Sequence, residues 1–402
     1  MSSEKTILDY KTTEQKFKPF HQTFSHCAFF LSIALMYPNK NNIPIRVFVF
    51  GMFLLFNGYI IYCFCTYHFK CLIRHDMYNL SRNTTVGILI SLFFFKTFYV
   101  SYKSQTFGEL LKKITEDLLK GNHMEHDYQE IYEHYIKLGK MGEFCWILIP
   151  VLLSLQFPLY ASMCTIIESL KSDTGKRYMV HEMDIKYLED KQYESPYYEM
   201  IFAYSLMQCF ILVPNFSGFD GSFCVATNHL RLKLKLITRK LYKAFKDSEN
   251  RTILRARVIE SIKEHQEALQ FYNHLQEMYG GWLLMVFLVT SLMISLSLYM
   301  IFLTKRVDPV YTIFAISGVV HMLAPCYYAC NLVKSSEDFS VDIYHVQWEQ
   351  WSDVVVTKLL TIMIVKAQQP LILSGQGLVY FNMQLFITVL QTSYSVFTLI
   401  SS

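Results

Sequence analysis

Residues 280–304, GGWLLMVFLVTSLMISLSLYMIFLT, decide the fold class of this chain because they contain no Asp, Glu, Lys or Arg. A helix needs about 20 apolar residues to cross the hydrocarbon core of a bilayer, and this stretch is long enough. A stretch at 83–102 is interrupted only by Lys96, and five others are free of charge: 47–69, 144–167, 200–219, 309–333 and 367–402. The sequence therefore predicts an all-α membrane protein with seven transmembrane helices.

The composition argues against several other classes of protein. Charged residues make up 17% of the chain, whereas a soluble domain carries about 25%. The net charge of +4 is too small to indicate a nucleic-acid partner. The ten cysteines show no CxxC spacing, and a run of His and acidic residues at 123–134 fits a solvated helix face better than a metal site. Since no HExxH or GxSxG motif is present either, we expect no metal, no cofactor and no enzymatic activity.

The distribution of Lys and Arg predicts the orientation. These residues gather in the arm 1–46 and in the connections 103–140 and 231–278. Basic connections stay in the cytoplasm, so we expect a cytoplasmic N-terminus and an external C-terminus. Both connections carry apolar residues at helical spacing, and 231–278 contains neither Pro nor Gly. This pattern predicts long cytoplasmic helical extensions whose apolar faces pack in an anchor bundle, formed between subunits.

Polar residues in or beside the spans are the next candidates for function. A charge inside a span is costly and faces the protein interior, so Lys96 needs a partner, for which Glu143 and Asp220 are the candidates. Asn79 and Asn83 begin Asn-x-Ser/Thr tripeptides in the first external connection and are glycosylation candidates. Four prolines also kink the spans, which favours a cavity between splayed helices with aromatic walls, suited to a ligand that is mostly hydrocarbon.

The last quarter of the chain carries a specific pattern. It has Ser335-Ser336, Ile343-Tyr344 with Trp348 four residues later, and three longer motifs: Cys326-Tyr-Tyr-Ala-Cys-Asn331, Ala367-Gln-Gln-Pro370 and Tyr394-Ser-Val-Phe-Thr-Leu399. This pattern resembles the span-six to span-seven signature of insect odorant receptors. Two positions depart from it, since Cys330 stands where the family has Gly and Asp342 where a small residue is common.

The resemblance implies an odorant-gated, non-selective cation channel in the plasma membrane of olfactory neuron dendrites. In that family a variable, odour-tuning subunit forms a heterotetramer with the shared co-receptor, Orco, and binds a small volatile odorant. This chain resembles the tuning subunit because it lacks the long cytoplasmic insertion of the co-receptor. Pro370 and Gly375 would then split span seven. The expected parts are the cytoplasmic arm 1–46, spans one to four in 47–230 with the 103–140 connection, anchor helices 231–278, spans five and six in 279–333, a cytoplasmic half of span seven in 334–369, and a pore-lining half in 376–402.

The same resemblance supplies candidate functional residues. In the terminal helix it places Phe397, Ile400 and Ser401 at the pore and its gate. Tyr344, Trp348 and Trp351, with the stripe Leu359, Leu360 and Met363, are expected in the bundle that joins subunits. The family's odorant pocket lies in the outer half of the membrane between spans two, three, four and six. Depth along each helix selects Ser91, Phe94, Phe95, Ser154, Phe157, Tyr160, Ala161, Tyr204, Leu206, Phe210, Tyr311, Phe314 and Ser317. This uncharged set suits a neutral terpenoid or ester rather than an amine or acid.

Two other receptor classes and a transporter are the alternatives. A seven-span receptor that signals through G proteins places its N-terminus outside and carries D/E-R-Y and N-P-x-x-Y motifs, which this chain lacks. A gustatory receptor of the same superfamily carries TYxxxxxQF in its last helix, where this chain has Thr392-Ser-Tyr394 and no QF. A transporter is disfavoured because the chain shows no inverted repeat and few intramembrane charges.

Overall fold

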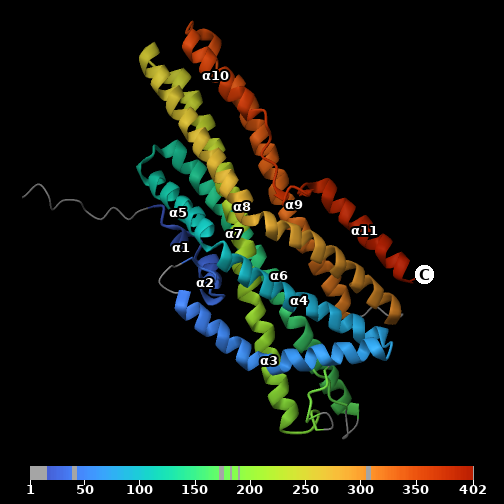
Figure 1. Cartoon of the computed structure of the whole chain (residues 1–402). Helices are drawn as coiled ribbons and strands as arrows, with labels where there is room; N and C mark the ends of the chain where they lie inside the picture. Colours follow the sequence, from blue (N-terminus) through green and yellow to red (C-terminus); the bar gives the residue numbers. More distant parts are fainter. Residues whose placement is uncertain are drawn as a thin grey trace, which may run out of the picture.

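The computed structural model describes residues 16–38, 43–171, 176–181, 183–188, 191–304 and 309–401. Within these ranges the chain is almost entirely helical, and Figure 1 shows long helices that run through two connected regions. The lower region in that view is the membrane bundle, and the upper one, where α10 and the far ends of α7, α8 and α9 meet, is the anchor bundle.

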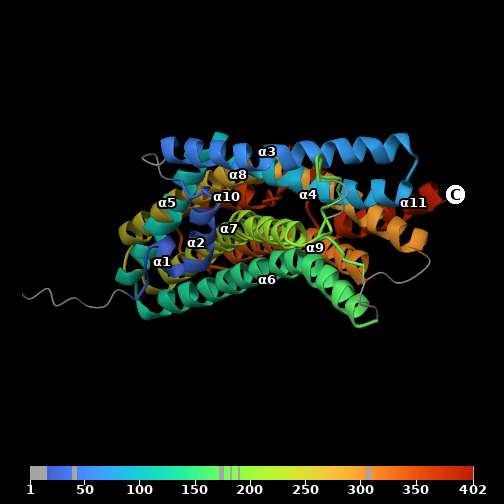
Figure 2. The same cartoon turned by 90° about the horizontal axis from the view of Figure 1, so that it is seen from below.

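Among the described residues, six helices of the membrane bundle are long and apolar enough to cross a bilayer. They are α3 (Ile43–Ile73), α4 (Met77–Tyr102), α6 (His126–Lys171), α7 (Tyr197–Asp247), α8 (Arg251–Thr304) and α9 (Pro309–Tyr344). The seventh is α11 (Met383–Ser401), whose 19 residues carry no formal charge. Large apolar side chains on the outside of α3, such as Leu55 and Phe56, are more than two-thirds exposed, as expected where lipid covers them. In Figure 2, α7 lies between α3 and α6.

The anchor bundle is built from the continuations of α6, α7, α8 and α9 beyond the apolar stretches, together with α5 (Ser104–Lys120) and α10 (Val354–Ala367). The 3-10 turn η2 (Gly121–His123) links α5 to α6. The apolar stripe of α5, which includes Leu110, Ile114 and Leu118, is at most 1% exposed. This stripe is therefore buried within one chain, which corrects the expectation that a second subunit is needed to cover it.

A buried carboxylate and an ion pair hold the anchor bundle together. Asp117 of α5 accepts hydrogen bonds from Lys233 Nζ at 2.7 Å and pairs with His229 Nε2 at 3.1 Å, both on α7. Burial raises the pKa of Asp117, but these two partners lower it by more, so the pKa lies well below its usual range. The ion pair joins α8 to α10: Arg255 Nε, at the start of α8, donates to Asp353 Oδ2, directly before α10, at 2.8 Å. Asp353 also caps α10 by accepting from the backbone N–H of residue 355.

Two short helices near the N-terminus, α1 (Phe20–Thr23) and α2 (Ser25–Ile33), pack into this framework. Phe20 and Leu31 are fully buried. The backbone of α2 lies so close to α7 at Gly218 that an added Cβ would come within 2.7 Å of the Leu31 nitrogen. The 1–46 segment, expected only as a cytoplasmic arm, thus contributes to the core over its described part.

Span seven is split, as the sequence predicts. After α10 the chain forms a small antiparallel hairpin of β1 (Ser374–Gly375) and β2 (Val379–Tyr380), and then enters α11. Gln376 and Gly377 take positive φ values of 54° and 73°, which a type I′ turn requires. One boundary differs from the expectation, because residues 334–344 continue α9 and do not belong to the cytoplasmic half of span seven. The short 3-10 turn η3 (Trp348–Gln350) then leads into α10.

Candidate functional site

A cavity of about 120 Å³ lies among α3, α4, α6 and α7 and is bordered by the connecting segment that holds His181 and Met183. Pro150 of α6 is part of its wall, in line with the expectation that a kinked helix opens space beside it. The wall contains no Asp, Glu, Lys or Arg among the residues that line it. It is the kind of concave, mostly apolar site that takes a small organic molecule.

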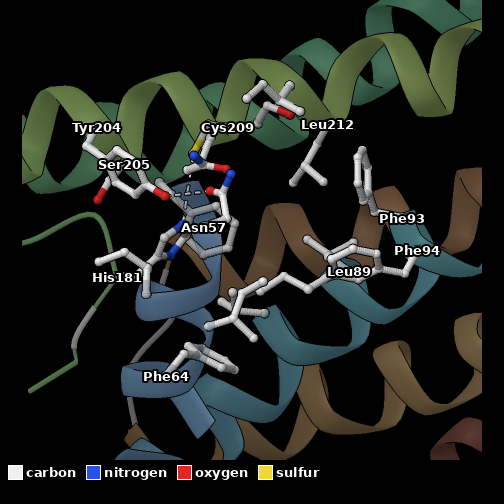
Figure 3. A pocket seen from close by; sticks show the side chains of 18 of the residues that line it. Asn57, Phe64, Leu89, Phe93, Phe94, His181, Tyr204, Ser205, Cys209 and Leu212 are labelled. Carbon is white, nitrogen blue, oxygen red and sulfur yellow. Dashed lines mark hydrogen bonds between the residues drawn. The ribbon is translucent and has the colours of Figure 1, made fainter. Parts of the chain in front are cut away.

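Polar side chains gather at one end of this cavity, where Figure 3 shows Asn57, Tyr204, Ser205 and His181 close together. The Tyr204 hydroxyl donates to Asn57 Oδ1, which joins α7 to α3. Burial lowers the pKa of His181 to about 4, and the positive charge of Arg82 adds to this, so the imidazole is neutral at physiological pH. The Nε2 of Gln208, which also lines the cavity, is buried without a hydrogen-bond partner within the described residues. A ligand oxygen would find its hydrogen bonds at this end.

The opposite end is apolar and aromatic. Figure 3 shows Leu89, Phe93, Phe94 and Leu212 there, away from the polar group. The Phe93 ring lies 5.6 Å from the Phe94 ring at 81° and 5.6 Å from the ring of Phe53. These are favourable aromatic geometries that fix the shape of the wall. The cavity thus matches a molecule with a hydrocarbon body and a single polar group.

A second, smaller cavity of about 20 Å³ lies among α4, α6, α7, α8 and α9. It shares wall residues with the first, including Leu89, Leu153 and Phe216. These shared side chains separate the two spaces.

The structure brings only part of the predicted odorant set together. Phe94, Ser154, Phe157 and Tyr204 line the large cavity, and Ser317 lines the small one. Phe314 packs behind Phe157 with ring centroids 5.8 Å apart. The others lie outside both walls: Ser91, Phe95, Tyr160, Ala161, Leu206, Phe210 and Tyr311.

Sequence reasoning missed the contribution of α3 and of the outer connecting segment. Asn57 and Phe64 come from α3, and His181 comes from the segment, which has no helical periodicity to locate it. A polar Asn57 within a run of apolar residues was the one signal in the sequence that pointed to α3.

Lys96 is fully buried and paired with Asp220, one of its two predicted partners. Its Nζ lies 2.8 and 2.7 Å from the two Asp220 carboxylate oxygens. The other candidate, Glu143, does not take this role. Instead it accepts from the backbone N–H of Cys27 and lies 3.8 Å from His26.

In α11 the predicted pore residue Phe397 is half-buried and packs against Phe302 of α8, with ring centroids 5.8 Å apart. The side chains of Ile400 and Ser401 lie outside the described part of the chain. The helix leaves a different face uncovered, and that face carries a row of polar residues at helical spacing: Gln384, Thr388, Gln391, Ser395 and Thr398.

The predicted assembly residues divide between two environments. Trp351 Nε1 donates to the Phe245 carbonyl of α7 at 3.2 Å, and Trp348 packs against the same core. These two tryptophans therefore contact their own subunit, whereas Tyr344 is 61% exposed. Within α10, Leu360 and Met363 are buried and Leu359 is half-buried, all packed on the chain's own core. The opposite face of α10 exposes four apolar side chains: Val354, Val355, Ile362 and Val365.

Of the two glycosylation candidates, Asn83 is only 2% exposed within α4. A glycan has no room there, so that prediction is wrong. The Asn79 side chain donates to Asp76 at the start of α4 and stays a candidate.

Comparison with known proteins gives one consistent result. The model of the family described as 7tm Odorant receptor matches residues 76–394. Odorant receptor 10 of Aedes albopictus is 24% identical over 69% of this chain and 71% of its own length. Odorant receptor 30a of Drosophila melanogaster is also 24% identical, over 56% of this chain and 60% of its own. The solved structure of the olfactory receptor OR5 from Machilis hrabei in complex with eugenol shares the fold, with a TM-score of 0.75, 16% identity and coverage of 94% of this chain and 97% of that one. The chain therefore belongs to the insect odorant receptor family.

Proposed function

We propose that this chain is the odour-tuning subunit of an odorant-gated, non-selective cation channel in the plasma membrane of olfactory neuron dendrites. It binds a small neutral volatile, such as a terpenoid or an ester, and opens a pore within a heterotetramer that contains Orco. The observation that carries the proposal is the uncharged cavity with its polar end at Asn57 and Tyr204 and its aromatic end at Phe93 and Phe94. A charged amine or acid would lie there without a counter-ion. Burying even a neutral polar group without a hydrogen-bond partner costs on the order of 2–7 kcal/mol, and burying an unpaired charge costs more.

The uncovered faces of two helices support the assembly and the pore. The exposed apolar face of α10 in the anchor bundle needs a partner, and another subunit is the natural one. The polar row of α11, centred on Gln391, faces away from its own subunit and would line an aqueous path when four subunits surround an axis. A lining of neutral amides and hydroxyls suits weak selection among cations, because it offers oxygen ligands without fixed charge.

The test is to record whole-cell currents from cells that express this chain with Orco, or Orco alone, with G-protein signalling blocked. The panel contains geranyl acetate, linalool, ethyl hexanoate and eugenol, together with butylamine and butyric acid as charged compounds. We expect a current from at least one neutral compound that requires both chains and persists under the block. A response confined to the amine or the acid, or one abolished by the block, would overturn the proposal.

A matched pair of variants locates the ligand. Phe94 lines the cavity, whereas Phe98, one turn along α4, is 58% exposed and does not line it. Removing an aromatic wall that a ligand contacts costs roughly 1.5–3 kcal/mol. Phe94→Ala should therefore raise the half-activating concentration by about tenfold or more, since each 1.4 kcal/mol is a factor of ten. Phe98→Ala should leave it unchanged, and equal effects of both variants would place the odorant elsewhere.

A further inference from the structure

Phe216, a residue of the cavity wall, also contacts the buried ion pair beneath it. Its ring lies in both cavity walls, and Lys96 Nζ lies 3.8 Å from its centroid. Lys96 also binds Asp220, which follows Phe216 by one helical turn on α7. The ammonium of α4 is thus held at once by an aromatic face and a carboxylate of α7.

The ion pair continues into α9 and α8 through a histidine. His321 Nε2 of α9 lies 3.3 Å from Asp220 Oδ2, and its Nδ1 lies 3.3 Å from Thr290 Oγ1 of α8. With the proton on Nε2, the imidazole donates to the carboxylate and Nδ1 accepts from the threonine hydroxyl. Thr290 is 1% exposed and the ion pair is fully buried. Of these hydrogen-bonded side chains, only the edge of His321 can therefore bind water as an alternative partner.

From this point on α8, hydrogen bonds reach the pore-forming helix. Ser291, the residue after Thr290, provides a carbonyl that accepts from Ser393 Oγ of α11 at 3.2 Å. One turn further along α8, Ser295 Oγ donates to the Ser393 carbonyl at 3.3 Å. Both contacts are to Ser393, which has no exposed surface. These contacts, joined between Thr290 and Ser295 by the backbone of α8, connect the cavity wall to α11.

We propose that this series, Phe216, Lys96, Asp220, His321, Thr290, Ser295 and Ser393, is a relay that couples occupancy of the cavity to the position of α11. The inference rests on the proposed function. A molecule that fills the cavity presses on Phe216 and displaces the ring from the ammonium it faces. Because water cannot replace either partner of the buried pair, Lys96 and Asp220 have to move together. His321 then follows through its hydrogen bond to the Asp220 carboxylate. Its other bond passes the shift to α8 and so to Ser393. These are positioning residues, which bias opening without touching the odorant, Phe216 excepted.

The relay is tested with two variants that keep size and fold. Thr290→Val removes the hydroxyl that His321 contacts but keeps the shape of the side chain. Ser295→Ala removes the bond to Ser393 and has a close control in Ser297→Ala. Both serines lie on α8, are at most 2% exposed, and donate to the carbonyl four residues earlier. Among the residues that the structure describes, only Ser295 of the two also has a hydrogen bond to α11. Each is co-expressed with Orco and studied with the most active neutral compound of the panel above.

We expect Thr290→Val and Ser295→Ala to change the half-activating concentration or the unliganded current by at least about fivefold, the lower end of ordinary coupling between sites. Ser297→Ala should stay within about twofold of the unsubstituted receptor. A second readout separates coupling from binding: the increase in thermal stability that the same compound gives to the detergent-solubilised receptor should be equal in all three variants.

The outcomes are separable. If no neutral compound of the panel opens the unsubstituted channel, the proposed function fails and the relay fails with it. If the channel opens but Thr290→Val and Ser295→Ala match Ser297→Ala in both half-activating concentration and unliganded current, the relay alone is overturned. A loss of the thermal shift in Thr290→Val or Ser295→Ala also overturns it, because the residue would then act on binding.

Discussion

Removal of Lys96 should destabilise the receptor far more than removal of both members of its ion pair. Lys96→Met leaves the Asp220 carboxylate fully buried without a counter-charge, apart from a contact with His321. Breaking a buried pair in this way costs about 3–5 kcal/mol. The contact between Lys96 Nζ and the Phe216 ring, at 3.8 Å, is lost as well. In the double variant Lys96→Met/Asp220→Leu, two apolar side chains of similar size replace the pair, which is often neutral or even stabilising.

The assay is the temperature at which the detergent-solubilised receptor loses its monodisperse peak in size-exclusion chromatography, measured for both single variants and the double variant. The two single variants should melt well below the double variant. The double-mutant cycle then gives a large coupling free energy between Lys96 and Asp220. Lys112→Met is the control, because that side chain is 77% exposed and lies 3.8 Å from Glu116 on the same helix, a pairing worth about 0.3–0.5 kcal/mol. A double variant that melts below both single variants would refute the reasoning, since each charge would then be stabilised by something other than its partner.

Three further changes have expected outcomes. Asp117→Asn should lower the melting temperature at neutral pH by the equivalent of about 3 kcal/mol, because it leaves Lys233 and His229 without their buried carboxylate. Those partners depress the pKa of Asp117, so its charge contributes fully to stability above the ordinary aspartate pKa of about 4, and this contribution is lost as the pH falls below it. The difference in melting temperature between Asp117→Asn and the unsubstituted receptor should therefore disappear at acidic pH. Ile362→Glu, on the exposed face of α10, should reduce co-purification with Orco while the melting temperature of the isolated chain is unchanged. Gln391→Glu would add a carboxylate to the uncovered face of α11 and should shift the reversal potential toward higher calcium permeability.

Much of the membrane fold is predictable from the sequence because its determinants are local. A charge-free stretch such as 280–304 has to satisfy its backbone within itself, and a helix is the only way for a single segment in lipid. The pairing of Lys96 with Asp220 was also within reach, since a buried charge needs an opposite one and few are available near the spans. Glu143 had the same chemistry, and only its position beside α2 explains why it binds the backbone of Cys27 instead.

The cavity is harder to predict because it depends on which helices lie beside one another. Depth along each span correctly brings Phe94 and Phe157 to the wall, but it says nothing of helix rotation, so residues such as Ser91 and Phe210 point elsewhere. His181 belongs to a segment without periodicity and enters the wall through tertiary contacts alone. The tryptophans of the anchor bundle show the same limit. Aromatic side chains at this place need a buried environment, but the sequence does not say whether their own subunit or a neighbour provides it.

The packing of α2 against Gly218 has a consequence for how the receptor is made on the ribosome. The Cys27 thiol donates to the Gly218 carbonyl, a contact between residues 191 positions apart. At a synthesis rate of about 5–20 residues per second, α2 exists for roughly 10–40 seconds before its docking site emerges. Throughout that time Leu31, which is fully buried in the finished molecule, lacks the surface of α7 against which α2 packs. During biogenesis a chaperone or the membrane surface therefore has to cover the apolar side of α2. A tag that delays the docking of α2 will lower the yield of receptor rather than its response to odour.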